Sequence, residues 1–122
     1  MPWVFDDNRP IYTQLLEKIR FDIIAGIYKP GDRLPSVREL AAEAAVNPNT
    51  MQKALSDLER TGLIFSKRTN GRFITEDIAM IQSLKTQLAE EKVSEFMEQM
   101  KQLGFTLEET IQIIQSMIRE EK

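Results

Sequence analysis

The sequence predicts a mainly α-helical protein with one small β-hairpin. Apolar residues recur at the three- and four-residue spacing of amphipathic helices along most of the 122 residues. Two capping boxes, Ser36 with Glu39 and Thr106 with Glu109, indicate where helices begin. The pair Asn70-Gly71 separates two runs of β-prone residues, which is the strongest short-range signal for a hairpin.

The first expected helix covers residues 10–25. Ile11, Leu15, Ile19 and Ile23 share one face, Pro10 suits a first turn, and Gly26 can close the helix with a positive φ. A turn at residues 28–32 follows. Pro35 then favours an extended conformation for Arg33 and Leu34.

Two further helices are joined by a short turn. The first begins at the Ser36 cap, and the second has Asn47 as its cap and Pro48 as its first residue. The second covers residues 48–61 and is closed by Gly62. Two short helices in this arrangement form a helix-turn-helix. A hairpin over residues 64–75, the wing, follows directly, so residues 9–76 are predicted to form a winged helix-turn-helix domain.

Residues 77–122 are predicted to form two more helices, separated at Gly104. Two helices cannot bury so many apolar residues against each other, so we expect this region to be a dimer interface. The expected interface residues are Leu84, Leu88, Phe96, Met97, Met100, Ile111 and Ile114. Packing against the N-terminal domain is the alternative. A pocket for an unknown small-molecule effector is a further, less favoured one.

Composition excludes several classes of function. The chain has no Cys and no His, which rules out disulfides, thiolate nucleophiles, zinc fingers and histidine bases. No Gly-rich loop or pocket motif gathers other reactive groups, so we expect no enzyme, no cofactor and no metal. An acidic start and the lack of an apolar run of about 20 residues predict a cytoplasmic protein without a membrane partner.

The net charge of −3 is unevenly distributed. Residues 1–76 carry 11 Lys and Arg against 10 Asp and Glu, a net charge of +1, whereas residues 77–122 carry 5 against 9, a net charge of −4. The N-terminal domain is therefore the better candidate for phosphate binding.

The third helix has a polar face that suits DNA. Met51, Ala54, Leu55 and Leu58 should face the core, which leaves amide, hydroxyl and ammonium groups on the other side. Such groups hydrogen-bond to base edges and phosphates, although they also form ordinary solvated faces. The candidate residues on this face are Asn49, Thr50, Gln52, Lys53 and Ser56.

Basic residues flank that helix in the sequence. Arg33 and Arg38 lie beside the Ser36 cap, where phosphate can approach. The wing carries Lys67, Arg68, Asn70 and Arg72, which suit a DNA backbone or a narrow minor groove. Protection of an exposed strand edge would also favour Lys and Arg in the wing, and the sequence leaves both interpretations open.

The run PGDRLPSVRELA at residues 30–41, with Asn49-Thr50, Leu55, Leu58 and Gly62-Leu63-Ile64, resembles the DNA-binding domain of the GntR family of bacterial regulators. The resemblance covers about residues 9–76, and the short C-terminal region is similar to the YtrA-type subfamily. The family resemblance implies a homodimer that binds a palindromic operator. The DNA contacts that it implies come from Arg33, Ser36, Arg38, Asn47, Asn49, Thr50, Gln52 and Gly71.

The resulting hypothesis is a dimeric transcriptional regulator, expected to be a repressor, with double-stranded operator DNA as its partner. The alternative is a winged-helix module that binds another protein and not DNA.

Overall fold

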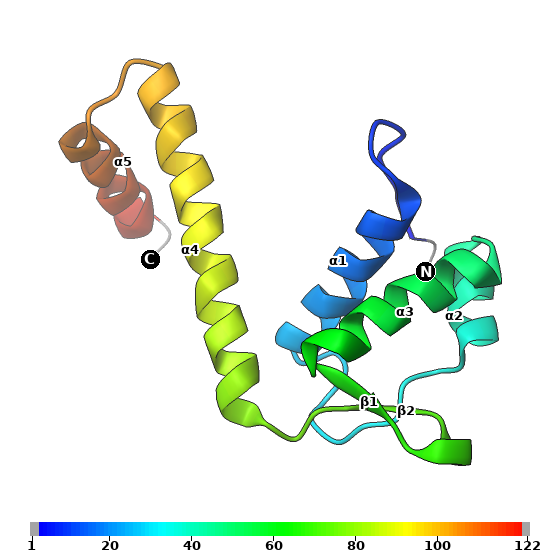
Figure 1. Cartoon of the computed structure of the whole chain (residues 1–122). Coiled ribbons are helices and arrows are strands. Elements are labelled where there is room, and N and C mark those ends of the chain that lie inside the picture. Colours follow the sequence, from blue (N-terminus) through cyan, green and yellow to red (C-terminus); the bar gives the residue numbers. More distant parts are fainter. Residues whose placement is uncertain (1–2, 121–122) are drawn as a thin grey trace. The chain divides into compact units, whose positions relative to one another are not determined.

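The computed structural model describes residues 3–120, which form two compact units that divide between Lys85 and Thr86. The first unit contains three helices and a hairpin (Figure 1). These elements are α1 (Ile11–Ile24), α2 (Val37–Ala44), α3 (Pro48–Thr61), β1 (Ile64–Ser66) and β2 (Arg72–Ile74). Helix α4 (Ile78–Gln102) begins in this unit and continues into the second, which also contains α5 (Leu107–Glu120). The predicted fold class, mainly helical with a winged helix-turn-helix, is confirmed.

The helix ends follow the local signals in the sequence. Ser36 caps α2 through a complete capping box, in which its hydroxyl accepts from the Glu39 amide at 3.1 Å. Asn47 caps α3 and accepts from the Asn49 amide at 2.8 Å. Gly26 and Gly62 adopt φ values of 84° and 86° at the ends of α1 and α3. Left-handed backbone of this kind closes helices.

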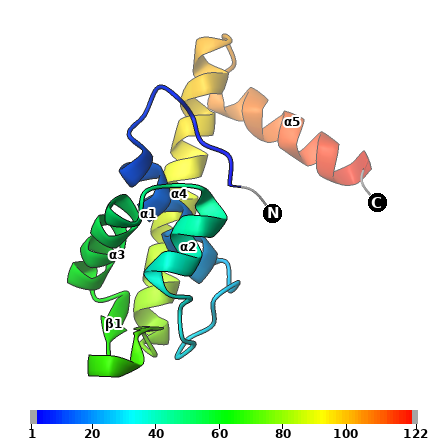
Figure 2. The same ribbon diagram turned by 90° about the vertical axis from the view of Figure 1, so that its right-hand side faces the viewer.

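The core of the first unit lies where α1 and α2 pack against α3. Figure 2 shows α2 and α3 side by side, with β1 near the end of α3. The four predicted core residues of α3 are at most 1% exposed: Met51, Ala54, Leu55 and Leu58. They pack with Leu15, Ile19, Ile23, Leu34, Leu40, Leu63, Ile64, Ile74 and Ile81. Ile81 belongs to α4, so the first turns of that helix help to close this core.

The wing is held by a third segment of chain. Within the hairpin, Ile64 pairs with Ile74 and Ser66 with Arg72, so each strand is shorter than predicted. The Leu34 amide donates to the Arg72 carbonyl at 2.9 Å, and the Ile74 amide donates to the Asp32 carbonyl at 2.8 Å. The segment before α2 therefore pairs with β2. These backbone bonds support a two-stranded hairpin, which would be marginally stable in isolation.

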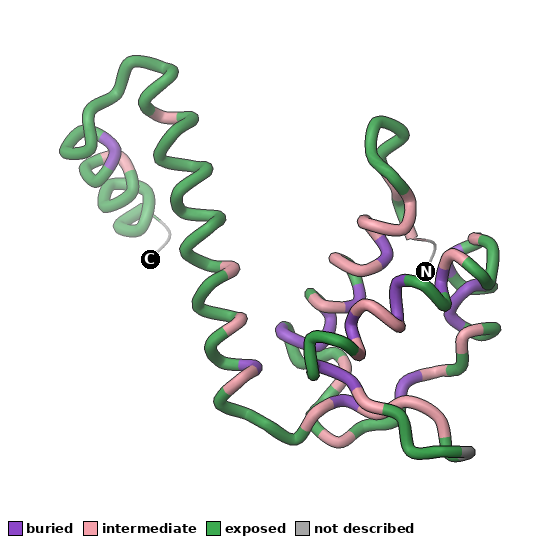
Figure 3. Tube along the Cα trace, viewed as in Figure 1, coloured by how far each residue is buried: buried purple, intermediate pink, exposed green. Residues whose placement is uncertain are grey.

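The second unit is largely exposed. Helix α4 is continuous from Ile78 to Gln102. A capping box of Thr106 and Glu109 begins α5, as predicted. Figure 3 shows buried residues concentrated in α1, α2, α3 and the wing, whereas the later part of α4 and most of α5 are exposed. Among residues 3–120, no helix is both long enough and apolar enough to cross a bilayer.

Candidate nucleic-acid interface

Helix α3 buries one face and exposes the other. Met51, Ala54 and Leu55 recur at helical spacing and pack inward. This spacing turns the predicted polar residues away from the core: Asn49, Gln52 and Lys53 are exposed, and Thr50 and Ser56 are half-buried. The Gln52 amide donates to the Ser56 hydroxyl at 3.4 Å, one turn later. The side chains of Asn49, Gln52 and Lys53 therefore lie on the surface and not in the core.

The Lys53 ammonium lies over an aromatic ring. Its Nζ is 4.3 Å from the centre of the Tyr12 ring, which α1 contributes. The ring face attracts a cation, so Tyr12 restrains a long and otherwise mobile side chain. Lys53 remains exposed in this position. Its charge is therefore held beside the polar face of α3.

A second group of polar residues lies at the start of α2. Ser36 and Arg38 are both exposed. The Ser36 backbone amide donates to Oε1 of Glu39 at 3.1 Å, and hydrogen bonding from Ser36, this bond first, holds the pKa of the Glu39 carboxyl below its usual value. Ser36 thus fixes the first turn of α2 through its bonds to Glu39.

Arg33 connects this region with the wing. A β-carbon added to Gly71 would lie 3.1 Å from Nε and 3.3 Å from Nη2 of Arg33. The guanidinium of Arg33 therefore lies against the backbone at the tip of the wing. Gly71 also adopts φ 96° and ψ −161°, a conformation that essentially only glycine tolerates. Two predicted site residues that are far apart in the sequence are brought together here.

The tip of the wing is a short 3-10 turn over Arg68–Asn70 rather than a two-residue Asn-Gly turn. Arg68 is exposed and has a φ of 41°. The rings of Phe65 and Phe73 stack at 6.0 Å, and the Lys67 ammonium lies 4.7 Å from the Phe73 ring. The charged groups of Lys67 and Arg68 therefore both lie at the tip of the hairpin.

Arg72 is placed differently from the other basic residues of the wing. Its side chain is 19% exposed, and its Nε donates to Oε1 of Glu59 at 2.7 Å. The Ser66 hydroxyl donates to the same oxygen at 2.8 Å. The bond from Ser66, and then that from Arg72, holds the pKa of the Glu59 carboxyl below its usual value. The end of α3 is therefore joined to both strands of the wing.

These features match a known family. Residues 11–74 fit the family described as bacterial regulatory proteins, gntR family. The HTH-type transcriptional repressor YtrA of Bacillus subtilis is 46% identical over 96 residues, which are 79% of this chain and 69% of that protein. The chain belongs to the GntR family. It is thus a transcriptional regulator with a winged helix-turn-helix domain, as the sequence predicted.

Solved structures of the GntR family agree with this assignment. A GntR family transcriptional regulator from Listeria monocytogenes superposes with a TM-score of 0.84 at 39% identity, covering 92% of this chain and 98% of that one. The DNA-binding domain of AraR in complex with operator ORX1 has a TM-score of 0.55 at 28% identity, covering 62% and 95%. The first similarity extends over both units of this GntR-family chain.

The sequence did not predict that Tyr12 and Glu59 would belong to this region. Both hold a predicted site residue, Tyr12 through its ring and Glu59 through its carboxylate. In the sequence, Tyr12 is one of the apolar residues at helical spacing in the first helix, and Glu59 is one of several acidic residues. No local pattern identifies either partner, because both contacts join segments that are distant in the sequence.

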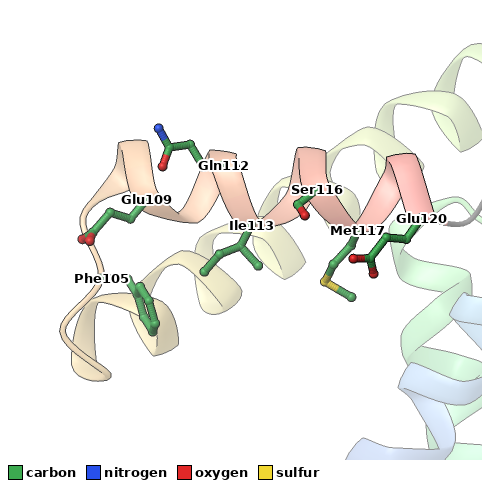
Figure 4. Close-up of a pocket in the computed structure, with 7 residues that line it drawn as sticks. All are labelled: Phe105, Glu109, Gln112, Ile113, Ser116, Met117 and Glu120. Carbon is green, nitrogen blue, oxygen red and sulfur yellow. The ribbon is translucent and has the colours of Figure 1, made fainter.

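The predicted dimer residues of this GntR-family chain divide into two groups. Leu84 is half-buried against the core of the first unit. Phe96, Met97, Ile111 and Ile114 are 39–45% exposed, and Leu88 and Met100 are half-buried. An open groove of about 380 Å³ lies along α5, and Figure 4 shows its lining, with Phe105, Ile113 and Met117 as the apolar part.

Proposed function

We propose that this chain is a sequence-specific repressor that binds a palindromic operator as a homodimer. The observation that carries the proposal is the orientation of α3, which buries its apolar face and exposes Asn49, Gln52 and Lys53. In helix-turn-helix proteins this second helix enters the major groove. Two relatives support the proposal: YtrA is named a repressor, and the AraR domain is described in complex with an operator.

In this proposal the polar face of α3 reads the bases. The amides of Asn49 and Gln52 can hydrogen-bond to adenine, and Thr50 can donate to or accept from a base edge. Asn47 lies at the start of the same helix, where its Oδ1 already caps the backbone. Its side-chain NH₂ is the part that can contact a phosphate.

The phosphate contacts come from the residues around α3. Arg33 and Arg38 flank the first turn of α2, and Lys53 lies beside Tyr12. Lys67 and Arg68 extend the basic surface to the tip of the wing. Each phosphate contact releases counterions, so affinity should fall steeply as salt is added, with a slope of about 0.9 per contact on logarithmic axes.

The second unit supplies the dimer interface in this proposal. Phe96, Ile111 and Ile114 leave large apolar surfaces exposed along α4 and α5. Surfaces of this kind mark association sites. A twofold dimer would present two α3 helices to half-sites about 34–36 Å apart, or a multiple of one DNA turn.

Selection of bound duplexes from a random pool, with and without cell extract, tests the proposal. We expect an inverted repeat to be enriched. Arg38→Ala should weaken binding to all duplexes, and Gln52→Ala should change the preferred bases. Gln87→Ala, at an exposed position of α4, serves as the matched control and should bind like the wild type. A chain that binds no duplex in a salt-dependent way would instead be a protein-interaction module.

A further inference from the structure

We propose that Glu59 is a positioning residue for DNA binding, which fixes the wing relative to α3 so that both reach the DNA together. The inference rests on the proposed function, because it assumes that α3 and the wing contact one duplex. It also assigns Arg72 a different role from its neighbours. Arg72 acts through Glu59, whereas Lys67 and Arg68 contact phosphates.

The geometry shows a connection at a single oxygen. Oε1 of Glu59 accepts from the Ser66 hydroxyl of β1 at 2.8 Å and from Nε of Arg72 of β2 at 2.7 Å. Glu59 lies in the last turn of α3, three residues before Gly62. One carboxylate therefore bridges the candidate recognition helix and both strands of the hairpin.

The hairpin needs such a connection. Each strand has three residues, and a two-stranded hairpin of this length is marginal on its own. The backbone bonds to Asp32 and Leu34 hold one edge of β2. Glu59 adds a bond between charged groups, which is roughly twice as strong as a neutral one. Without it, the orientation of the wing would depend on backbone pairing and on the apolar contacts of Ile64 and Ile74.

The burial of Arg72 supports its separate role. Its side chain is 19% exposed, and the Glu59 side chain is 31% exposed. The bonds from Ser66 and Arg72 also hold the pKa of the Glu59 carboxyl below its usual value, so the carboxylate stays charged at neutral pH. Lys67 and Arg68, in contrast, are exposed at the tip.

The direction in which DNA affinity changes when Glu59 is removed tests the proposed role. Loss of a negative charge from a DNA-binding protein should strengthen its attraction to phosphates. If Glu59 positions the wing, Glu59→Ala should instead weaken binding by about tenfold, the size of one charged hydrogen bond. Glu91→Gln, a charge-removing change at an exposed position of α4, is the control and should bind as tightly as the wild type or slightly more tightly.

The probe is a duplex that the wild-type full-length chain has selected from a random pool, titrated at several salt concentrations. Release of the wing should reduce the salt slope by about 0.9 for each lost phosphate contact, or by about 1.8 if Lys67 and Arg68 both detach. Partial unfolding lowers the apparent affinity equally at all salt concentrations and leaves the slope unchanged. Glu59→Gln, which can still accept from both donors, should restore part of the affinity and of the slope.

A double-mutant cycle separates the two roles of Arg72. If Arg72 acts through Glu59, Arg72→Ala should have little further effect on affinity in the Glu59→Ala background. Additive losses, an unchanged salt slope, or binding as tight as that of the wild type would each overturn the inference. If the wild-type chain itself binds no selected duplex, the proposed function fails, which is a separate outcome from these.

Discussion

The guanidinium of Arg33 lies against the backbone of Gly71, where a β-carbon would be 3.1 Å from its Nε. The contact joins the segment before α2 to the tip of the wing. Two parts of the candidate interface therefore meet at this contact. A side chain at residue 71 would strain the backbone and would also require the guanidinium of Arg33 to shift.

We expect Gly71→Ala to impair DNA binding and stability together. The conformation of Gly71 costs other residues about 1–3 kcal/mol, and the added methyl group would displace Arg33. Thermal unfolding and gel shifts measure the two effects. Gly26→Ala is the control, because Gly26 has a φ of 84° but no atom within 4 Å of the added carbon. It should lose stability and keep its DNA affinity; equal losses of affinity in both variants would contradict the prediction.

We expect Lys53→Ala to reduce both the salt dependence of DNA binding and the stability of the fold. Loss of one phosphate contact lowers the salt slope by about 0.9. Loss of the contact with Tyr12 lowers the free energy of unfolding by about 0.5–1 kcal/mol. Titrations at several salt concentrations and urea unfolding measure these quantities. Lys92→Ala, at an exposed position of α4, should change neither; an unaltered slope in Lys53→Ala would remove Lys53 from the interface.

We expect Ile111→Glu combined with Ile114→Glu to convert the proposed dimer into a monomer. Both side chains are 40–45% exposed in the single chain, and two charges would be buried without partners in a dimer. Sedimentation measures the change in mass. Operator affinity should fall roughly a hundredfold or more, because each half-site then binds alone. Gln115→Glu adds charge at another exposed position of α5 and should remain dimeric. A doubly substituted chain that stays dimeric would exclude this face from the interface.

We expect Glu59 to make the stability of the fold depend on pH in the acidic range. Bonds from Ser66 and Arg72 lower its pKa in the folded state below the ordinary value of 4.5. The carboxylate therefore contributes fully above about pH 4.5, and its contribution is lost as the pH falls through the lower, folded-state pKa. Urea unfolding between neutral and acidic pH should show a shallower dependence for Glu59→Gln than for Glu91→Gln. Parallel curves for the two variants would argue against the shift.

The helices were predictable because their signals are local. The capping box at Ser36, the cap at Asn47 and the closing Gly62 each act within a few residues, and the structure has them where expected. The buried face of α3 was predictable from spacing alone. The wing was predicted as a hairpin, but its strands are shorter because a 3-10 turn at Arg68–Asn70 takes up part of the expected strand.

The sequence by itself determined the order of the elements, the core face of each helix of the first unit and the polar face of α3, because these depend on spacing along one segment. Only the tertiary structure decided that Arg33 crosses Gly71, that Lys53 lies over Tyr12 and that Arg72 bonds to Glu59. Periodicity specifies which way a side chain points from its own helix or strand. The packing of separate segments specifies which other side chain it meets.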